Sequence, residues 1–386
     1  LYIMISILEK SGILRQAQDK LKEVSNALLK AGFEACLVGG CVRDILLEKE
    51  PNDWDITTNA RPEEIQKIFP ESVYENNFGT VGVKTDSSNP RLKIIEITTY
   101  RLEGKYTDKR HPDEVVFAKT IEEDLARRDF TVNALALIRQ LADEGMASKI
   151  IDPFGGVQDL GKKIIKAVGD PEMRFQEDAL RLMRAVRFMA QLGFKIEDET
   201  EEAIKKHAGL LEFISHERIR DEISKTLMTE RAAEGIDKMR ELGILKYAIP
   251  ELMEGVGVSQ NHHHIFTVFE HNLKSLDYAA KKDLSLEIRL ASLLHDVGKP
   301  KSKRGEGLDA TFYGHQVIGA RMAAQILDRL KFSKEIIENV VLLIREHMFV
   351  YDPETVTDAG ARRLLRRVGA ENMDDLFSLR EADRIG

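Results

Sequence analysis

The sequence predicts an α+β protein in which an N-terminal part with a mixed sheet precedes an all-helical remainder. Alternating apolar and polar residues indicate strands over 53–57, 79–85 and 93–100. From Asp178 onward, apolar residues recur at helical spacing and strand signals almost vanish. With 386 residues, 43% of them hydrophobic, the chain can bury several cores, because domains usually hold about 100–200 residues.

The elements follow in order along the chain. Residues 19–31 indicate an amphipathic helix, which a short apolar strand at 35–38, a Gly-Gly turn and a helix at 42–47 follow. Glycines punctuate the helical part, and residues 255–261 give its best internal boundary. We therefore expect three domains: a head over 19–157, a helical neck and body over 158–254, and a helical module over 255–386.

Composition excludes several classes of protein. Cys36 and Cys41 are too few for a disulfide framework, as expected for a reducing cytoplasm. The sequence contains no stretch of about 20 apolar residues and its start lacks a basic leader, so no membrane association is expected. Beginning with Leu1, the chain leaves open whether residues are missing at either end, and nothing in it predicts an oligomeric state.

The formal charge of −8 argues against nucleic-acid binding, since phosphates attract Lys and Arg. The arginines are nevertheless clustered, at 181, 184 and 187, at 218 and 220, and at 362, 363, 366 and 367. A basic path through an acidic protein is one interpretation. For the last cluster, a solvated helix face with paired charges is the other.

A glycine turn and two nearby carboxylates form the strongest local signal. Gly39 and Gly40 lie between a strand and a helix, where backbone N–H groups can approach a phosphate. Asp53 and Asp55 are two apart, so on a strand their carboxylates share a face and suit two divalent cations for in-line phosphoryl transfer. A solvated Asp-x-Asp turn remains the alternative.

Five blocks resemble class II nucleotidyltransferases, the family of transfer-RNA CCA-adding enzymes and bacterial poly(A) polymerases. In the family order they are 37–57, 122–134, 152–156, 177–188 and 215–219. The resemblance implies that Gly40 and Arg43 hold the triphosphate of the nucleotide and that Arg128 contacts the nucleotide. It also implies that Asp53 and Asp55 hold Mg²⁺.

Glu96 lies in the strand pattern at 93–98, on the opposite side from Ile95 and Ile97. We expect a third catalytic carboxylate here, with an exposed strand glutamate as the alternative.

Base selection without a template is assigned to one helix. Asp178, Arg181 and Arg184 are spaced by three residues, so they are expected to share a face that imitates the edge of a pairing base. The resemblance implies this role, and it implies further nucleotide contacts for Arg184 and Arg187. Surface salt bridges with Glu177 are the alternative. The polar segment 103–112 resembles a mobile lid, although His111 replaces the family's usual arginine.

The C-terminal module contains candidate metal ligands at His271, His295, Asp296 and Asp383, with His315 and His347 for a second position. This set resembles that of the HD phosphohydrolase superfamily. A helical scaffold with scattered histidines is the alternative, and the run at 262–264 has no assigned role.

The sequence thus predicts a nucleotidyltransferase that adds C, A or both to tRNA 3′ ends from CTP and ATP with Mg²⁺. A second divalent metal (Mg, Mn or Ni) in the HD site would support hydrolysis. A poly(A) polymerase, a metal phosphohydrolase acting on RNA ends and a non-catalytic RNA scaffold remain alternatives.

Overall fold

The computed structural model describes residues 12–74, 79–87, 89–102, 116–142, 145–260, 265–305, 307–350, 352 and 354–385. The chain forms two compact units. The first comprises Leu1–Asp178 with Lys195–Thr200, and the second comprises Ala179–Phe194 with Glu201–Gly386.

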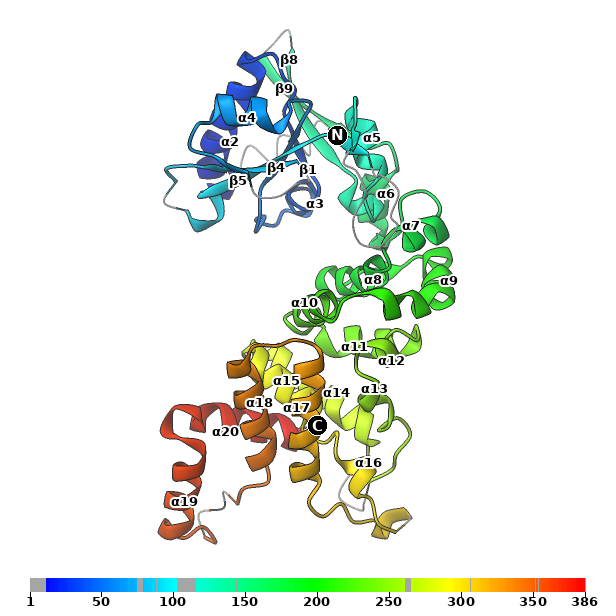
Figure 1. Cartoon of the computed structure of the whole chain (residues 1–386), viewed down its shortest axis with the longest axis vertical. Coiled ribbons are helices and arrows are strands. Elements are labelled where there is room, and N and C mark those ends of the chain that lie inside the picture. The colour runs from blue at the N-terminus through cyan, green and yellow to red at the C-terminus, as the bar shows by residue number, and fades with distance from the viewer. Residues whose placement is uncertain are drawn as a thin grey trace. The chain divides into compact units, whose positions relative to one another are not determined.

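A seven-stranded sheet forms the centre of the first unit (Figure 1). Its spatial order is β3 (Val73–Tyr74), β4 (Thr80–Lys84), β5 (Ile94–Thr99), β2 (Asp55–Thr58), β1 (Cys36–Val38), β8 (Ala136–Ala142) and β9 (Gly145–Ile151). β2 and β5 run parallel, and the other neighbouring pairs are antiparallel. The predicted mixed sheet is therefore confirmed.

Short helices cover the sheet because its central strands are strongly apolar. Ile95 and Ile97 of β5 are fully buried, as the alternation along a half-covered strand requires. α4 (Pro62–Ile68) packs against β4 and β5, and α2 (Gly12–Lys30) packs against α4. α3 (Gly40–Leu46) follows β1, and α5 (Ile121–Ala126) begins with a capping box in which Thr120 and Glu123 bond each other's backbone N–H.

The first unit also contains smaller elements. They are a two-stranded sheet of β6 (Arg101–Leu102) and β7 (Val116–Phe117), the 3₁₀ turns Pro90–Leu92 and Thr131–Asn133, α6 (Gly156–Lys162), β10 (Ile164–Ile165) and α7 (Pro171–Glu177). β10 pairs in parallel with β11 (Lys195–Ile196), so the chain returns to this unit after α8.

Within its described residues, the second unit is helical apart from loops and one isolated β-bridge between Arg304 and Thr311. Its first part holds α8 (Leu180–Leu192), most of α9 (Asp198–His207), the 3₁₀ turn Ala208–Phe213, α10 (His216–Leu227), α11 (Ala232–Glu241), α12 (Leu245–Ala248) and α13 (Pro250–Met253). Its second part holds α14 (Val268–Lys281), α15 (Leu286–Leu294), α16 (Lys299–Ser302), the 3₁₀ turns Gly307–Asp309 and Ala370–Asn372, α17 (His315–Arg329), α18 (Lys334–Glu346), α19 (Asp358–Val368) and α20 (Met373–Ile385).

A buried arginine connects the two parts of this unit. The Arg289 side chain on α15 is 1% exposed and donates hydrogen bonds to the backbone carbonyls of Leu227 (2.8 Å) and Thr229 (3.0 Å), just after α10. It also pairs with Asp283 at 2.8 Å. These bonds satisfy a guanidinium that would otherwise be very unfavourable in the interior.

A close backbone contact fixes the start of α17. A Cβ atom at Gly298 would lie 2.4 Å from the carbonyl oxygen of His315, so only glycine fits. The described helices include none that combines the length and the apolar character needed to cross a membrane.

Candidate functional site

Asp53 and Asp55 lie at the entry to β2 in the first unit. Asp55 opens the strand, whereas Asp53 lies exposed in the bend before it, so the expectation that both stand on a strand is wrong. Burial raises the pKa of Asp55, the Arg128 charge opposes this, and the Asp53 charge raises that pKa further. The two carboxylates therefore repel each other where Asp55 is partly desolvated. A bound cation would relieve this repulsion.

Glu96 is the third acid expected at this site. It is the register partner of Asp55 on the parallel strand β5. Partners across neighbouring strands project to the same face, so Glu96 lies beside Asp55, with its side chain exposed.

The glycine turn brings a guanidinium close to the backbone. Gly39 has a φ of 77°, and a Cβ atom there would lie 2.6 Å from Nη1 of Arg128. Arg128 in turn lies 3.5 Å from the buried carboxylate of Asp124. The turn, with Gly40 beginning α3, thus holds a cation near Asp55.

Arg43 is held in one orientation by two partners. Its Nη1 donates to Oδ1 of Asn133 at 2.7 Å, and its Nη2 pairs with Asp44 at 2.7 Å. The side chain is buried. The sequence patterns predicted no role for Asn133, Asp44 or Asp124, although all three lie within or beside the five blocks.

Asp178 and Arg181 do not share a helix. Asp178 follows α7 with extended backbone (φ −140°, ψ 104°), and α8 begins at Leu180. The expectation of one helical face fails here because α7 ends one residue earlier. Arg181, Arg184 and Arg187 do lie on α8 at i, i+3 spacing, and Arg181 is buried.

Glu222 of α10 is the acidic partner of two of these arginines. Arg187 Nε donates to its Oε2 at 2.7 Å, and Arg184 Nη1 lies 4.0 Å from its Oε1. Glu177, the partner considered from the sequence, pairs with Arg174 at 2.9 Å. Arg187 also lies over the Phe188 ring, 4.2 Å from its centroid, which fixes the guanidinium plane.

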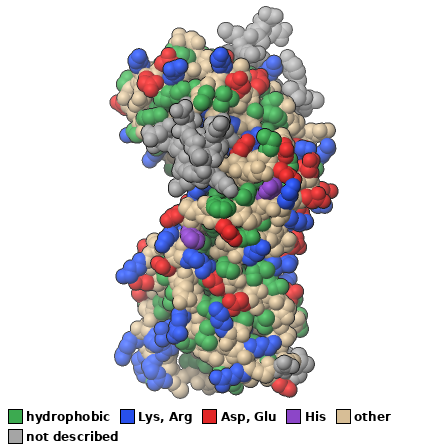
Figure 2. Space-filling model, turned by 45° about the vertical axis from the view of Figure 1, so that its right-hand side comes forward, with side chains coloured by type: hydrophobic (Ala, Val, Ile, Leu, Met, Phe, Trp, Pro, Cys, Tyr) green, Lys and Arg blue, Asp and Glu red, His purple; other side chains and the backbone are tan. Residues whose placement is uncertain are grey.

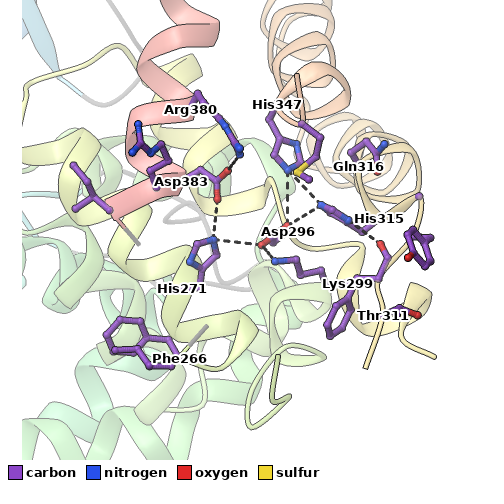
Figure 3. A pocket seen from close by; sticks show the side chains of 17 residues that line it. Phe266, His271, Asp296, Lys299, Thr311, His315, Gln316, His347, Arg380 and Asp383 are labelled. Atoms are coloured by element: carbon purple, nitrogen blue, oxygen red, sulfur yellow. Dashed lines mark hydrogen bonds and ion pairs between the residues drawn. The ribbon is translucent and has the colours of Figure 1, made fainter. Parts of the chain in front are cut away.

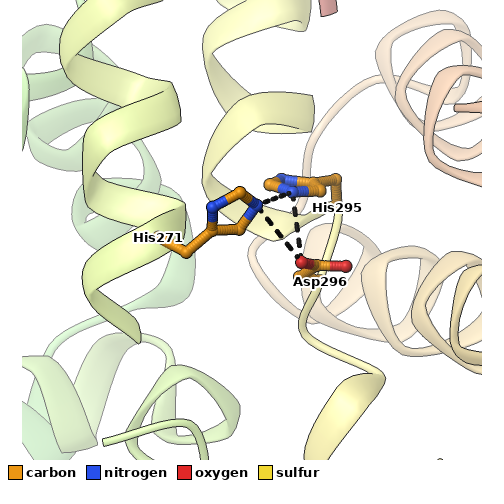
Figure 4. A group of neighbouring side chains, drawn as sticks. All are labelled: His271, His295 and Asp296. Carbon is orange, nitrogen blue, oxygen red and sulfur yellow. Dashed lines mark hydrogen bonds and ion pairs between the residues drawn. The ribbon is translucent and has the colours of Figure 1, made fainter. Parts of the chain in front are cut away.

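A second cluster lies inside the helices of the second unit (Figure 4). The Nε2 atoms of His271 on α14 and His295 at the end of α15 are 3.0 Å apart, and each lies 3.4 Å from Oδ2 of Asp296. Asp383 of α20 lies 3.1 Å from His271. Four residues from three helices and one loop thus meet as predicted.

The other oxygen of Asp296 faces two more histidines (Figure 3). Oδ1 lies 3.3 Å from Nε2 of His315 and 3.9 Å from Nε2 of His347, and these two nitrogens are 3.4 Å apart. Asp296 therefore stands between two ligand groups. His315, His347 and this shared carboxylate lie close enough together to hold a metal ion, at the second position expected from the sequence.

Backbone carbonyls orient three of the imidazoles. Nδ1 of His295, His315 and His347 lies 2.9, 2.8 and 2.6 Å from the carbonyl oxygens of Ser292, Phe312 and Ile344. A carbonyl only accepts, so each Nδ1 carries the hydrogen and directs Nε2 toward Asp296. Metal-binding histidines have this arrangement.

The pKa values of the histidines in this cluster are shifted in opposite directions. Burial alone lowers the pKa of His295, but the Asp296 and Asp383 carboxylates outweigh it and raise the pKa to about 10. Burial lowers the pKa of His347 to about 4 and also lowers that of His315. Despite its burial, Asp296 has a pKa well below its usual value, because His295 and Lys299 stabilise the carboxylate.

The spacing fits metal ions. Ligands bound at about 2.1 Å lie roughly 3.0–3.4 Å from one another, close to the 3.0–3.5 Å separations among His271, His295, Asp296 and Asp383. Lys299 on α16 is ion-paired with Asp296 and donates to Gln260 at 2.6 Å. It places a positive charge where the cluster is most acidic.

A cavity of about 930 Å³ opens onto this cluster. Basic side chains (Lys299, Arg380 and Arg384) and apolar ones (Phe266, Phe312 and Met348) line it. It therefore suits a ligand that combines phosphate with an apolar or aromatic part. The segment 103–112 and the histidines at 262–264 lie outside the described residues.

Three family models match the chain. Residues 35–166 match the poly A polymerase head domain, 193–255 match the probable RNA and SrmB-binding site of polymerase A, and 268–385 match the HD domain.

Individual relatives agree with these matches. The chain is 50% identical over 207 residues to the CCA-adding enzyme of Lactobacillus helveticus, covering 53% of this chain and 49% of that protein. It is 41% identical over 235 residues to that of a Geobacillus strain, covering 61% and 55%. The chain thus spans about half the length of the curated relatives it matches.

Solved structures match over more of the chain. The CCA-adding enzyme of Bacillus stearothermophilus in complex with CTP aligns with a TM-score of 0.72 and 30% identity, covering 95% of this chain and 78% of that one. The Thermotoga maritima CCA-adding enzyme complexed with tRNA aligns with a TM-score of 0.60 at 20% identity, covering 96% and 81%, which shows a shared fold.

Proposed function

Because this chain belongs to the family of CCA-adding enzymes, we propose that it is a tRNA nucleotidyltransferase that adds C, A or both to tRNA 3′ ends. CTP and ATP are the proposed nucleotides. The observation that carries the proposal is the placement of Asp55 beside Glu96, with Asp53 close enough to raise the pKa of Asp55. This acidic group lies near the arginine held at the glycine turn.

The head residues divide the work of the reaction. Asp53 and Asp55, with Glu96 beside them, would hold Mg²⁺, which supplies activation of the attacking hydroxyl and neutralisation of the leaving pyrophosphate. Arg43 is already oriented by Asn133 and Asp44, so it can bind the triphosphate at little entropic cost. Arg128, positioned over Gly39, supplies a second cation.

The arginines of α8 are proposed to choose the base. Arg181 is buried and Arg187 is fixed between Glu222 and Phe188, so both guanidinium groups have restricted orientations. A fixed guanidinium donates to ring nitrogens and carbonyls, and the Asp178 carboxylate accepts from exocyclic amines. Arg184 would add a further nucleotide contact.

The test is incubation of the protein with Mg²⁺, a tRNA that lacks its 3′ end, and each nucleoside triphosphate separately. Addition of one to three nucleotides from CTP, ATP or both supports the proposal. A long adenosine tract on any RNA would instead support the poly(A) polymerase alternative, and no addition at all would contradict both.

A second activity is favoured by the Asp296 cluster. We infer that the HD module is a metal-dependent phosphohydrolase, because one shared carboxylate faces two groups of histidines beside a basic cavity. Divalent ions (Mg, Mn or Ni) held there would supply an activated water molecule. Lys299, Arg380 and Arg384 would bind the phosphate group. RNA ends and nucleotides are the proposed substrates.

Metal analysis and assays with phosphate monoesters and cyclic phosphodiesters test this second activity. Bound divalent metal with hydrolysis of either ester class supports it. A protein that binds no divalent metal and hydrolyses neither class is better described as having a helical scaffold for RNA. The two buried thiols, Cys36 and Cys41, are free, which supports a proposed location in the cytoplasm.

A further inference from the structure

α19 is an unusually exposed helix of the second unit. Among its residues, Val368 alone is buried, and Leu365 is 46% exposed. The helix is nevertheless well defined at both ends: Thr357 caps its first turn by accepting from the N–H of Gly360 at 3.1 Å, and Gly369 with φ 82° ends it. Its side chains therefore extend from a fixed backbone into solvent.

Four arginines of this helix fall within a stretch of six residues. Arg367 pairs with Glu346 of α18 at 2.9 Å. Arg362, Arg363 and Arg366 are exposed and form no ion pair within the described part of the chain. Lys and Arg side chains gather at the lower left of Figure 2, at the level where Figure 1 places α19.

Folding alone does not account for this arrangement. Arg362 and Arg366 are four residues apart, and like charges at that spacing destabilise a helix. The helix dipole favours cations in the last turn, which explains Arg366 and Arg367 but not Arg362 and Arg363. Arg345 of α18 is also exposed and lies next in sequence to Glu346, the partner of Arg367.

We propose that Arg362, Arg363 and Arg366, here called the α19 arginine face, bind the phosphate backbone of the tRNA acceptor. The inference rests on the proposed function for its ligand. A chain of net charge −8 repels a polyanion on average, so attraction has to come from a local basic surface. Guanidinium groups suit phosphates because their paired N–H donors match phosphate oxygens.

RNA fits this face better than a membrane does. A helix that lies in a membrane surface presents a broad apolar face, whereas α19 exposes one large apolar side chain, Leu365, among its arginines. Exposed arginines therefore outnumber exposed large apolar side chains on this helix, which favours RNA over a membrane.

The experiment measures tRNA affinity against salt for the wild type and for the variant R362Q/R363Q/R366Q. Its matched control is K274Q/K281Q/K282Q, which removes the same charge from three exposed lysines in the same unit, two on α14 and one at its C-terminal cap. Each phosphate contact contributes about 0.7–0.9 to the slope of log K against log salt. We therefore expect the arginine variant to lose roughly tenfold or more in affinity at low salt and about 2 in slope, with the control near wild type.

A charge-preserving variant, R362K/R363K/R366K, should retain most of the affinity and slope. Circular dichroism and a melting curve check the fold, and single substitutions replace the triple variant if it unfolds. Wild-type extension of tRNA together with equal affinity and slope in the folded arginine variant overturns the proposal and leaves the proposed function intact. Failure of the wild type to bind tRNA defeats the proposed function itself. Binding of anionic vesicles instead of tRNA also overturns the proposal.

Discussion

Glu96 is the register partner of Asp55 on the neighbouring parallel strand, so the two carboxylates lie on one face of the sheet. Their relationship depends on strand pairing between residues 41 positions apart. It places Glu96 next to Asp55, as the proposed third catalytic carboxylate requires.

Substitution of Asp53 or Asp55 by Ala should abolish nucleotide addition while tRNA affinity stays nearly unchanged, because the proposed role of these carboxylates is to hold the metals rather than to pack. Glu96→Gln should lower the rate by roughly 10–100-fold. Primer-extension assays measure the rates, and Glu63→Gln, an exposed glutamate of α4, is the control. Near-normal rates in the Asp55 variant would refute the two-metal assignment.

Arg181→Ala should damage discrimination among bases more than triphosphate binding, since its buried guanidinium is proposed to read the edge of the base. We expect the ratio of kcat/KM for CTP over UTP to fall by about tenfold or more, with a smaller change in KM. Unchanged preference for CTP and ATP in a folded variant would show that Arg181 does not select the base.

Asp124→Asn should destabilise the first unit by about 3–5 kcal/mol, because Arg127 would lose its buried partner. Burial alone raises the pKa of Asp124, but Arg127 and Arg128 outweigh it and lower that pKa. A lowered folded-state pKa gives stability that is present above the unfolded value of about 3.9 and is lost as pH falls below it. Denaturant titrations between pH 7 and pH 3 measure this, and a variant whose stability difference does not shrink on acidification would contradict it.

His295→Ala should remove metal binding and any hydrolysis by the HD module and leave nucleotide addition unchanged. The reason is that His295 and the other proposed metal ligands of the cluster belong to the second unit, whereas Asp53, Asp55 and Glu96 belong to the first. Metal content and both activities are measured on the same preparation. Loss of addition in a folded His295→Ala protein would show that the two activities are coupled.

Metal binding at the two positions of the cluster should differ in its proton release. At neutral pH His295, with a pKa of about 10, must lose a proton to ligate, whereas His347, with a pKa of about 4, is already neutral. Affinity at the His271–His295 position should therefore rise by up to tenfold per pH unit below pH 10, while affinity at the His315–His347 position stays nearly constant. Calorimetry in buffers of different ionisation enthalpy, with His271→Ala and His315→Ala compared, measures the protons released. Equal release in both variants contradicts the assignment.

Most of the fold followed from local patterns. The alternation at 93–98 predicted β5 and placed Ile95 and Ile97 on the opposite face from Glu96, and the structure buries both isoleucines. The histidines and acids of the HD cluster also followed from sequence, through the His-Asp pair and its distant partners. The three domain boundaries and the roles of the site residues stay predictions.

Other features depend on tertiary contacts that no local pattern carries. Asp178 lost its expected helix because α7 ends at Glu177, a boundary within the usual error of one or two residues. Glu222 pairs with Arg187 across 35 positions, and Asn133 bonds Arg43 across 90. Such partners become visible only when the chain is folded.

The hydrogen bonds of the buried Arg289 side chain affect which sequence changes the second unit can accept. The Arg289 guanidinium donates to the backbone carbonyl oxygens of Leu227 and Thr229 rather than to their side chains. These hydrogen bonds therefore do not depend on which amino acids occupy the two positions. Sequence drift there leaves the joint intact, provided that α10 ends at the same point. A recombinant fragment that starts at residue 255 would lose both acceptors and would expose the Arg289 guanidinium, without these partners, at a new surface. Module exchange between relatives should therefore tolerate altered side chains at this joint but not an altered helix length.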